Sequence, residues 1–215
     1  MMKAWHLCNN DKRLGFSDRR VIRTGRTYKV AGPVKCCQHG LHGSRRLIDA
    51  LRYAQGEILC AVELTGQMDH QCDKVAATER KVVWMLNVSD ILHEFACWRA
   101  ERMLRAANVT DEQCWTAIRT KRRWLAGDAT DAELSAARLA TLSAARSAVA
   151  WSAQWMAYYA AHCSAAYPAA SVAAGLAANF TANSAACLGA DLVQVPAAYS
   201  AENRKLTKMV REARL

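Results

Sequence analysis

The chain has 215 residues, of which 52% are hydrophobic, and its 29 Lys and Arg residues against 19 Asp and Glu give a formal net charge of +10. This length suffices for one domain with a buried core, or for one domain with an extension. No run of about 18 apolar residues and no apolar leader at the N-terminus occur, so we expect no membrane span and a cytoplasmic protein.

Nine cysteines are present, none of them in a C-x-x-C pair. Reduced cysteines at apolar positions behave as small hydrophobic residues, which favours a reducing intracellular setting. The cluster of Cys36, Cys37, His39 and His42 is the one grouping that suggests zinc. Adjacent cysteines fit a tetrahedral ion poorly and no second pair of ligands follows, so we expect no metal.

The positive charge is concentrated near the N-terminus. Through Arg52 the chain has 12 Lys and Arg residues against three Asp, whereas the remainder is almost balanced. A local excess of this kind favours a polyanion or a phosphate-bearing ligand, although a solvated basic face without a ligand is the alternative. The predicted nucleic-acid contacts are Arg13, Arg19, Arg20, Arg23 and Arg26.

The first part of the chain alternates between strand-like and helical patterns. Apolar residues at every second position predict strands over 3–8, 27–30, 58–64 and 81–85, and helical spacing predicts a short helix over 47–54. Gln55-Gly56 ends that helix, because Gly accepts the left-handed conformation found after helix C-termini. We expect a polar connection between the last two strands.

The second part is rich in Ala and reads as helices. One helix follows the cap at Ser89-Asp90, and capping boxes at Thr110–Gln113 and Thr130–Glu133 predict two more. The helix from Thr130 is expected to reach about residue 164, followed by an Ala-rich segment over 169–188 and a basic helix over 200–214. The helix from Thr130 carries Trp and Tyr residues at one-turn spacings, which predict a core or an oligomer seam: Trp151, Trp155, Tyr158 and Tyr159.

The composition therefore changes near residue 88. We expect an α+β protein, with a small mixed sheet domain over 1–88 and an Ala-rich helical bundle or extension over 89–215. The helical part is the predicted surface for a homo-oligomer.

Several motifs along the whole chain resemble an uncharacterised family of short phage and prophage proteins. They are K-A-W-H from Lys3, Asp73-Lys74, A-T-E-R from Ala77 and Glu202-Asn203-Arg204. This resemblance implies a phage protein in the cytoplasm of a bacterial host, and it implies no function.

The central stretch is similar to the catalytic core of ADP-ribosyltransferases of the poly(ADP-ribose) polymerase type. That family has two Tyr residues eleven positions apart, an L-x-x-V-x-L-G strand, and a Glu before a final hydrophobic strand. Here His42 and Tyr53 are eleven apart, a strand through Gly66 follows, and Glu79 precedes the run from Lys81. Two departures are plain: His42 replaces the first Tyr, and the distance from His6 to Glu79 is short for this fold.

The resemblance implies roles for six residues in binding and cleaving NAD. Glu79 would orient the ribose hydroxyl and stabilise the oxocarbenium-like state, while Tyr53 and His42 would stack on the nicotinamide. His6 would contact the adenosine ribose, and Arg45 or Arg46 would hold the pyrophosphate. Three of them have a structural alternative: His6 as a packed core residue, Glu79 as an edge-strand charge and Tyr53 as part of an apolar helix face.

Two functions follow from these observations. The first is a phage-encoded, NAD-binding ADP-ribosyltransferase-like protein that modifies a nucleic acid or a host protein. The second is a non-enzymatic accessory protein that binds nucleic acid or a host factor. The sequence leaves open whether the protein is an enzyme. The two are distinguished by whether His42, Tyr53 and Glu79 line one cleft.

Overall fold

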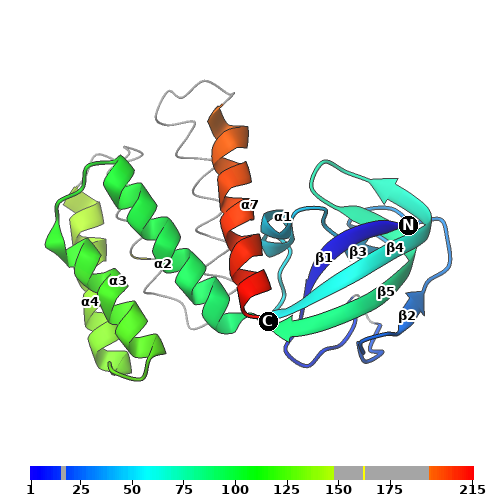
Figure 1. Ribbon diagram of the computed structural model, residues 1–215, viewed down its shortest axis with the longest axis horizontal. Coiled ribbons are helices and arrows are strands. Elements are labelled where there is room, and N and C mark those ends of the chain that lie inside the picture. Colours follow the sequence, from blue (N-terminus) through cyan, green and yellow to red (C-terminus); the bar gives the residue numbers. More distant parts are fainter. Residues whose placement is uncertain (16–17, 148–161, 163–193) are drawn as a thin grey trace. The chain divides into compact units, whose positions relative to one another are not determined.

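The computed structural model describes residues 1–15, 18–147, 162 and 194–215 of the chain. These residues form two compact units, each considered by itself below. The first unit holds Met1–Ser89 together with Lys205–Leu215, and the second holds Asp90–Arg204. Figure 1 shows the strands in the first unit and most of the helices in the second.

The first unit is built on a five-stranded antiparallel sheet. Its strands are β1 (Met2–Cys8), β2 (Thr27–Lys29), β3 (Leu41–Gly43), β4 (Ile58–His70) and β5 (Val75–Asn87). The order is β1-β4-β5-β2, and β3 pairs with β5 beyond the end of β2. One edge of β5 therefore pairs with the short strands β2 and β3. The other edge of β5 pairs with β4 over nearly the full length of both strands.

Four of these strands form a ring. Trp5 in β1 and Ser44 after β3 exchange two backbone hydrogen bonds of 2.8 Å, so β1 is linked to β3 as well as to β4. Register shifts at Ala61/Val62 and Thr65/Met68 bend β4 against β5. Such bulges increase local twist and bend a strand, which lets long strands curve around an interior (Figure 1).

Gly66 lies at the second bulge and has a φ of +76°. A Cβ built there would lie 2.1 Å from Oγ1 of Thr78, and that hydroxyl accepts a 3.0 Å hydrogen bond from the backbone of Gln67. Both the positive φ and the close approach require glycine at this position. The bulge is therefore encoded locally in β4 and β5.

Tyr28 anchors the short β2 strand in the core. Its side chain is 1% exposed, and its hydroxyl donates to the carbonyl oxygen of Val21 at 2.6 Å and accepts from the backbone N–H of Arg23 at 2.8 Å. It packs in one cluster with residues of the sheet such as Val62 and Val82. One aromatic residue thus fixes both β2 and the loop before it.

The second unit contains helices α2 (Ser89–Ala106), α3 (Glu112–Leu125) and α4 (Asp131–Ser147). Helix α2 packs on α3 through a buried apolar cluster that includes Cys97, Leu104 and Ile118. Arg122 of α3 also pairs with Glu94 and Glu101 of α2. Apolar and charged contacts therefore hold the same two helices together.

The two predicted capping boxes had different outcomes. At α4 the box is present as predicted: Oγ1 of Thr130 accepts from the backbone of Glu133, whose carboxylate accepts from the Thr130 N–H at 2.7 Å. At α3 the prediction of a box at Thr110 was wrong, because Asp111 is the N-cap and its carboxylate accepts from the Gln113 N–H at 2.9 Å. A carboxylate one residue later satisfies the same free N–H groups.

Helix α7 (Gln194–Glu212) begins earlier than the predicted 200–214. Pro196 lies in its first turn, where backbone N–H groups have no partner within the helix, so the proline is tolerated. Near its end, the guanidinium of Arg214 lies 4.5 Å from the ring centroid of Trp84. The continuation of the helix from Thr130 past residue 147, its aromatic residues and the segment 169–188 lie outside the described residues.

The α+β class is confirmed, with a sheet followed by helices. The sheet is antiparallel throughout, so the prediction of a mixed sheet was wrong. The predicted polar connection is a β-hairpin: β4 runs to His70 and β5 starts at Val75. Helix α1 (Leu47–Leu51) is shorter than predicted, and the strand at Leu41 was not predicted.

Replacing Tyr28 by Phe should lower the free energy of unfolding of the first unit by about 1–3 kcal/mol, because two part-buried backbone groups lose their hydrogen bonds to the hydroxyl. Urea titration of the full chain, read by amide exchange of β2 and β5 peptides, measures this change. Arg23→Ala is the matched control. The backbone N–H of Arg23 donates to the Tyr28 hydroxyl and is kept in this variant, so removing the exposed side chain should change the free energy of unfolding by less than about 0.5 kcal/mol. Equal effects of the two substitutions would contradict this role of the hydroxyl.

Candidate functional site

The first unit contains a cavity of about 570 Å³. Its walls come from β1, β3, the turn after α1, and the loops around Leu14 and Gln38, together with one residue of β5. The volume falls within the range of about 300–1,000 Å³ that is usual for small-molecule sites.

Arg80 is the residue that β5 contributes. Its side chain is 2% exposed, and its Nη1 donates to the carbonyl oxygen of His42 at 2.8 Å. Its Nε is buried and has no hydrogen-bond partner among the described residues, and no carboxylate of that part of the chain lies within ion-pair distance of it. Burial lowers the pKa of Arg80, but a guanidinium keeps its proton in proteins. A buried positive charge with a free donor therefore lines the cavity.

Two histidines lie on the cavity wall beside this charge. The pKa of His6 is well below its usual value, first because of burial and then because of the charge of Arg80. The pKa of His42 is lowered by the same two causes, with Lys74 adding to them, and its Nε2 accepts the backbone N–H of Cys37 at 3.2 Å. Both imidazoles are therefore neutral at pH 7, so they add hydrogen-bonding groups without adding charge.

A second polar group lies on the cavity wall around Lys74. Its ammonium lies 2.6 Å from the sulfur of Cys37 and 4.1 Å from the ring centroid of Tyr53. The Tyr53 hydroxyl in turn donates to Asp73 at 2.6 Å, and Arg52 contacts the same carboxylate at 3.2 Å. Burial acts to lower the pKa of Lys74, but its contacts with Cys37 and Tyr53 outweigh burial and raise it.

The structure brings together three of the six residues predicted to bind or cleave NAD. His6, His42 and Tyr53 all line the cavity. Arg45 and Arg46 do not: Arg45 contacts Nδ1 of His70 at 3.2 Å, and Arg46 pairs with Asp49 at 2.7 Å. Arg46 therefore contacts its own helix α1, whereas Arg45 contacts the end of β4.

Glu79 is absent from the cavity wall, so the predicted cleft of His42, Tyr53 and Glu79 does not form. Neighbouring residues of a strand point to opposite faces, and the inner position belongs to Arg80. Glu79 pairs with Lys29 of β2 at 2.7 Å and accepts from the Thr65 hydroxyl at 3.1 Å, and these two bonds lower its pKa. Its position is that of a sheet-surface charge.

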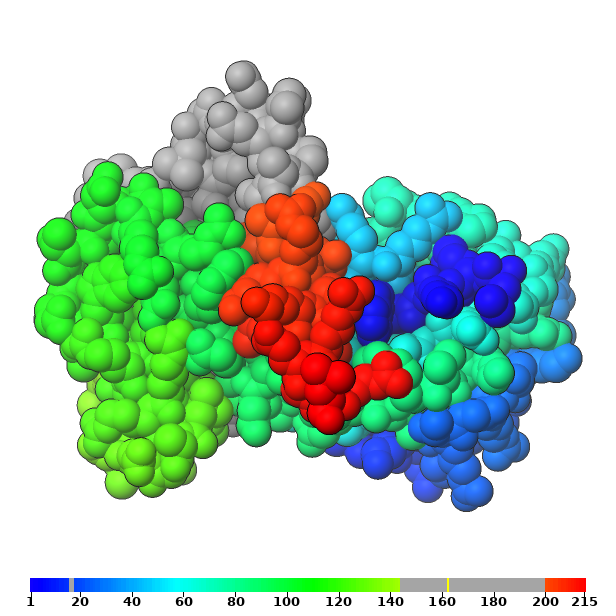
Figure 2. Space-filling view, in the orientation of Figure 1, coloured from blue at the N-terminus to red at the C-terminus, as the bar shows by residue number. Residues whose placement is uncertain are grey.

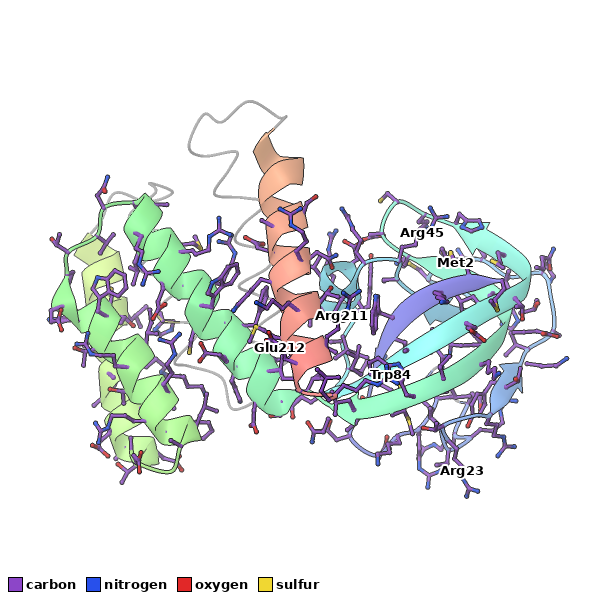
Figure 3. The ribbon with its side chains drawn as sticks, viewed as in Figure 1. Met2, Arg23, Arg45, Trp84, Arg211 and Glu212 are labelled. Atoms are coloured by element: carbon purple, nitrogen blue, oxygen red, sulfur yellow. The ribbon has the colours of Figure 1, made fainter. Side chains whose placement is uncertain are left out.

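The five arginines of the basic segment lie in the loop before β2 and in the turn leading to it. Two of them have carboxylate neighbours: Arg20 with Asp18 at 2.6 Å and Arg13 with Asp11 at 4.0 Å. Figure 2 shows this stretch, in blue, on the surface of the first unit, and Figure 3 places Arg23 and Arg45 at opposite ends of that unit. The basic segment and the predicted pyrophosphate contact therefore do not form one surface.

Sequence reasoning missed Arg80, Lys74 and Cys37 as residues of the site. Arg80 was not placed on a strand, because the predicted strand began at Lys81. Extending the alternation of Val82 back by two positions would have put Arg80 on the buried face. Lys74 and Cys37 come from separate loops, and no local pattern signals that they meet.

No helix of the described residues is long and apolar enough to cross a membrane. Within the same residues, no group of three or more His, Cys, Asp or Glu side chains is arranged to hold a metal ion.

The lowered pKa of His6 predicts a stability that depends on pH. The unfolded chain takes up the proton near the ordinary value of 6.5, whereas folded His6 takes it up only at lower pH. This contribution to stability is therefore complete above about pH 6.5 and lost as the pH falls below it. From pH 6.5 to 5.5, the free energy of unfolding should fall by up to about 1 kcal/mol more in the wild type than in His6→Gln. Urea titrations at the two pH values measure it, and parallel losses in both proteins would contradict it.

Comparison with known proteins relates part of the chain to a family. Residues 2–94 match the model of a family described as a domain of unknown function (DUF7666). No curated protein and no solved structure matches the chain. The matched residues include all five strands and every residue named above as lining the cavity, so this site belongs to the part of the chain that resembles that family.

Proposed function

We propose that the first unit binds a small phosphate-bearing molecule in this cavity, with NAD as the first ligand to test. The observation that carries the proposal is the buried guanidinium of Arg80 with its unpartnered Nε. Leaving a buried donor unpaired costs free energy, and buried charges in proteins are normally paired. An anionic group on a ligand would supply the missing partner.

The groups around Arg80 suit such a ligand. His6 and His42 are neutral and supply hydrogen-bonding groups, while Lys74 places a second positive charge on the wall. The Tyr53 ring offers an aromatic surface, and it is already in contact with Lys74. Phosphate oxygens bind well to guanidinium groups through charge-assisted hydrogen bonds. NAD combines an anionic pyrophosphate with rings that stack, so it matches both kinds of group.

The proposal concerns binding and does not include cleavage of NAD by Glu79. Asp18 is the carboxylate among the residues on the cavity wall, and Arg20 holds it and lowers its pKa. ADP-ribosyl transfer, the phage origin and a host-protein target stay predictions, as does an oligomer through the helical region.

Calorimetric titration of NAD and of inorganic pyrophosphate into the full chain tests this proposal. Arg80→Met should weaken binding by at least about tenfold, because a charge-assisted hydrogen bond is lost. The protein should stay folded, since a buried charge is replaced by an apolar chain of similar length. Lys81→Met removes the same charge from the next residue, which is exposed and on the other face, and should leave binding unchanged.

Two results would contradict the proposal. One is the absence of saturable heat with either ligand at millimolar concentration. The other is equal weakening by Arg80→Met and Lys81→Met, which would indicate a diffuse attraction by net charge.

The basic segment supports a second proposal, in which the unit also binds single-stranded nucleic acid. Arg19, Arg23 and Arg26 are exposed, and no carboxylate of the described residues lies within 4.0 Å of their guanidinium groups. Unpaired exposed arginines of this kind are free to contact phosphates.

Fluorescence anisotropy with a labelled single-stranded oligonucleotide tests this second proposal. Changing Arg19, Arg23 and Arg26 together to Gln should weaken binding and lower the slope of log K against log salt by up to about 0.7 per lost contact. The charge-matched control changes Arg105, Arg119 and Arg123, which are exposed on helices and paired with carboxylates. Equal losses in the two triple variants would overturn a specific role for the segment.

A further inference from the structure

Cys37 is an exposed thiol on the wall of the cavity. It lies in the loop closed by the backbone bridge between Lys35 and His39, and its φ of +68° is in the left-handed region. A residue other than Gly seldom adopts this conformation, which is enriched at functional positions. The loop therefore holds this residue in a defined, uncommon geometry.

The sulfur of Cys37 has a positive charge beside it. The Lys74 ammonium, 2.6 Å away, belongs to a side chain that is only 8% exposed. Contact with the Tyr53 ring limits where that ammonium can go. An adjacent ammonium favours the thiolate form of cysteine, and the thiolate is the nucleophile.

The cavity also presents the anion site described above. Arg80, whose buried Nε has no partner among the described residues, lines the same cavity as Cys37, and His42 contacts both residues: its carbonyl oxygen accepts from Arg80, and its ring nitrogen accepts from the Cys37 N–H. A ligand held by its negative group at Arg80 is thereby kept in the cavity that contains the thiol. Holding a reactant next to a nucleophile raises the effective concentration of each for the other.

We infer that Cys37 is the nucleophile of this cavity and reacts with electrophiles that carry a negatively charged group. The inference rests on the proposed anion site, because Arg80 is what selects the charged electrophile. Electrophiles with an anionic group are thus the substrate class. Cys37, which the sequence suggested only as a metal ligand, is the residue that reacts with them.

The reaction is a two-electron substitution that needs no oxidant or reductant. The thiolate sulfur attacks the electrophilic carbon and forms the S–C bond, while the bond to the leaving group breaks and that group departs with its electron pair. With iodoacetate the product is carboxymethyl-Cys37 and the leaving group is iodide. Lys74 stays protonated throughout.

Iodoacetate and iodoacetamide are a matched pair of probes, because they share the reacting carbon and differ in charge. Cys72 is the internal reference, since it is exposed and lies in the same unit. At pH 7, iodoacetate should modify Cys37 at least about tenfold faster than Cys72, the lower end of the gain that a cleft lined by opposite charge gives to a charged reagent. The ratio of the iodoacetate rate to the iodoacetamide rate should also be higher at Cys37 than at Cys72. Peptide mass spectrometry of the full chain measures both.

Two variants separate the contributions. Lys74→Met should reduce the rate at Cys37 to that of Cys72 with both reagents. Arg80→Met should remove only the preference for iodoacetate. In the wild type, with no substitution, inorganic pyrophosphate should protect Cys37 from iodoacetate. Equal rates at the two cysteines, the same reagent preference at both, or no protection by pyrophosphate would each overturn the inference.

Pyrophosphate titration of Cys37→Ser distinguishes this failure from failure of the proposed function. Retained binding with no preferential labelling in the wild type would overturn the nucleophile and leave the anion site standing. Loss of both would overturn the two together.

Discussion

The burial of one guanidinium is the constraint on which the site depends. Arg80 is held inside the ring of strands by a hydrogen bond to the His42 carbonyl, and its Nε has no partner among the described residues. Removing a charge from water costs several kcal/mol unless other groups compensate. Strand pairing keeps Arg80 buried despite this cost, because β5 is paired on both edges and bulges curve β4 against it. Strands β1 and β3 of the same sheet contribute walls of the cavity.

Burial and the charge of Arg80 together keep two neighbouring histidines neutral. Burial lowers the pKa of His6 and of His42, and the charge of Arg80 lowers both further. Lys74, at a different part of the wall, keeps its charge because Cys37 and Tyr53 contact it. Two positive centres with neutral hydrogen-bonding groups beside them form an arrangement suited to an anionic ligand. The helical unit contributes none of these residues.

Features encoded over a few residues could be predicted from the sequence. The α+β class and the capping box at Thr130 follow from local periodicity and from a four-residue pattern. The strand β3 could not be predicted in this way, because three residues carry too little alternation and it exists through pairing with β5. The cavity likewise joins Cys37, Lys74 and Arg80, and their proximity comes from long-range pairing.

The assignment of Glu79 shows why the site itself was harder to predict. The expected strand began one residue after Arg80, so the direction of its side chains was not fixed at Glu79. In a strand, a shift of one residue exchanges the buried and exposed faces. The resemblance to ADP-ribosyltransferases pointed to the carboxylate, while the structure buries the neighbouring Arg80 and places Glu79 with Lys29. His6, His42 and Tyr53, to which the same resemblance pointed, do line the cavity.

The most direct measurement is the ¹⁵N-edited NMR signal of the Arg80 Nε–H during titration with inorganic pyrophosphate. We expect a saturable shift of this signal and slower exchange of its proton with water, because the ligand becomes the partner that the Nε–H group lacks. Arg80→Met identifies the signal by its disappearance. An Nε–H signal that does not change while pyrophosphate is bound elsewhere would contradict the claim that Arg80 is the anion site.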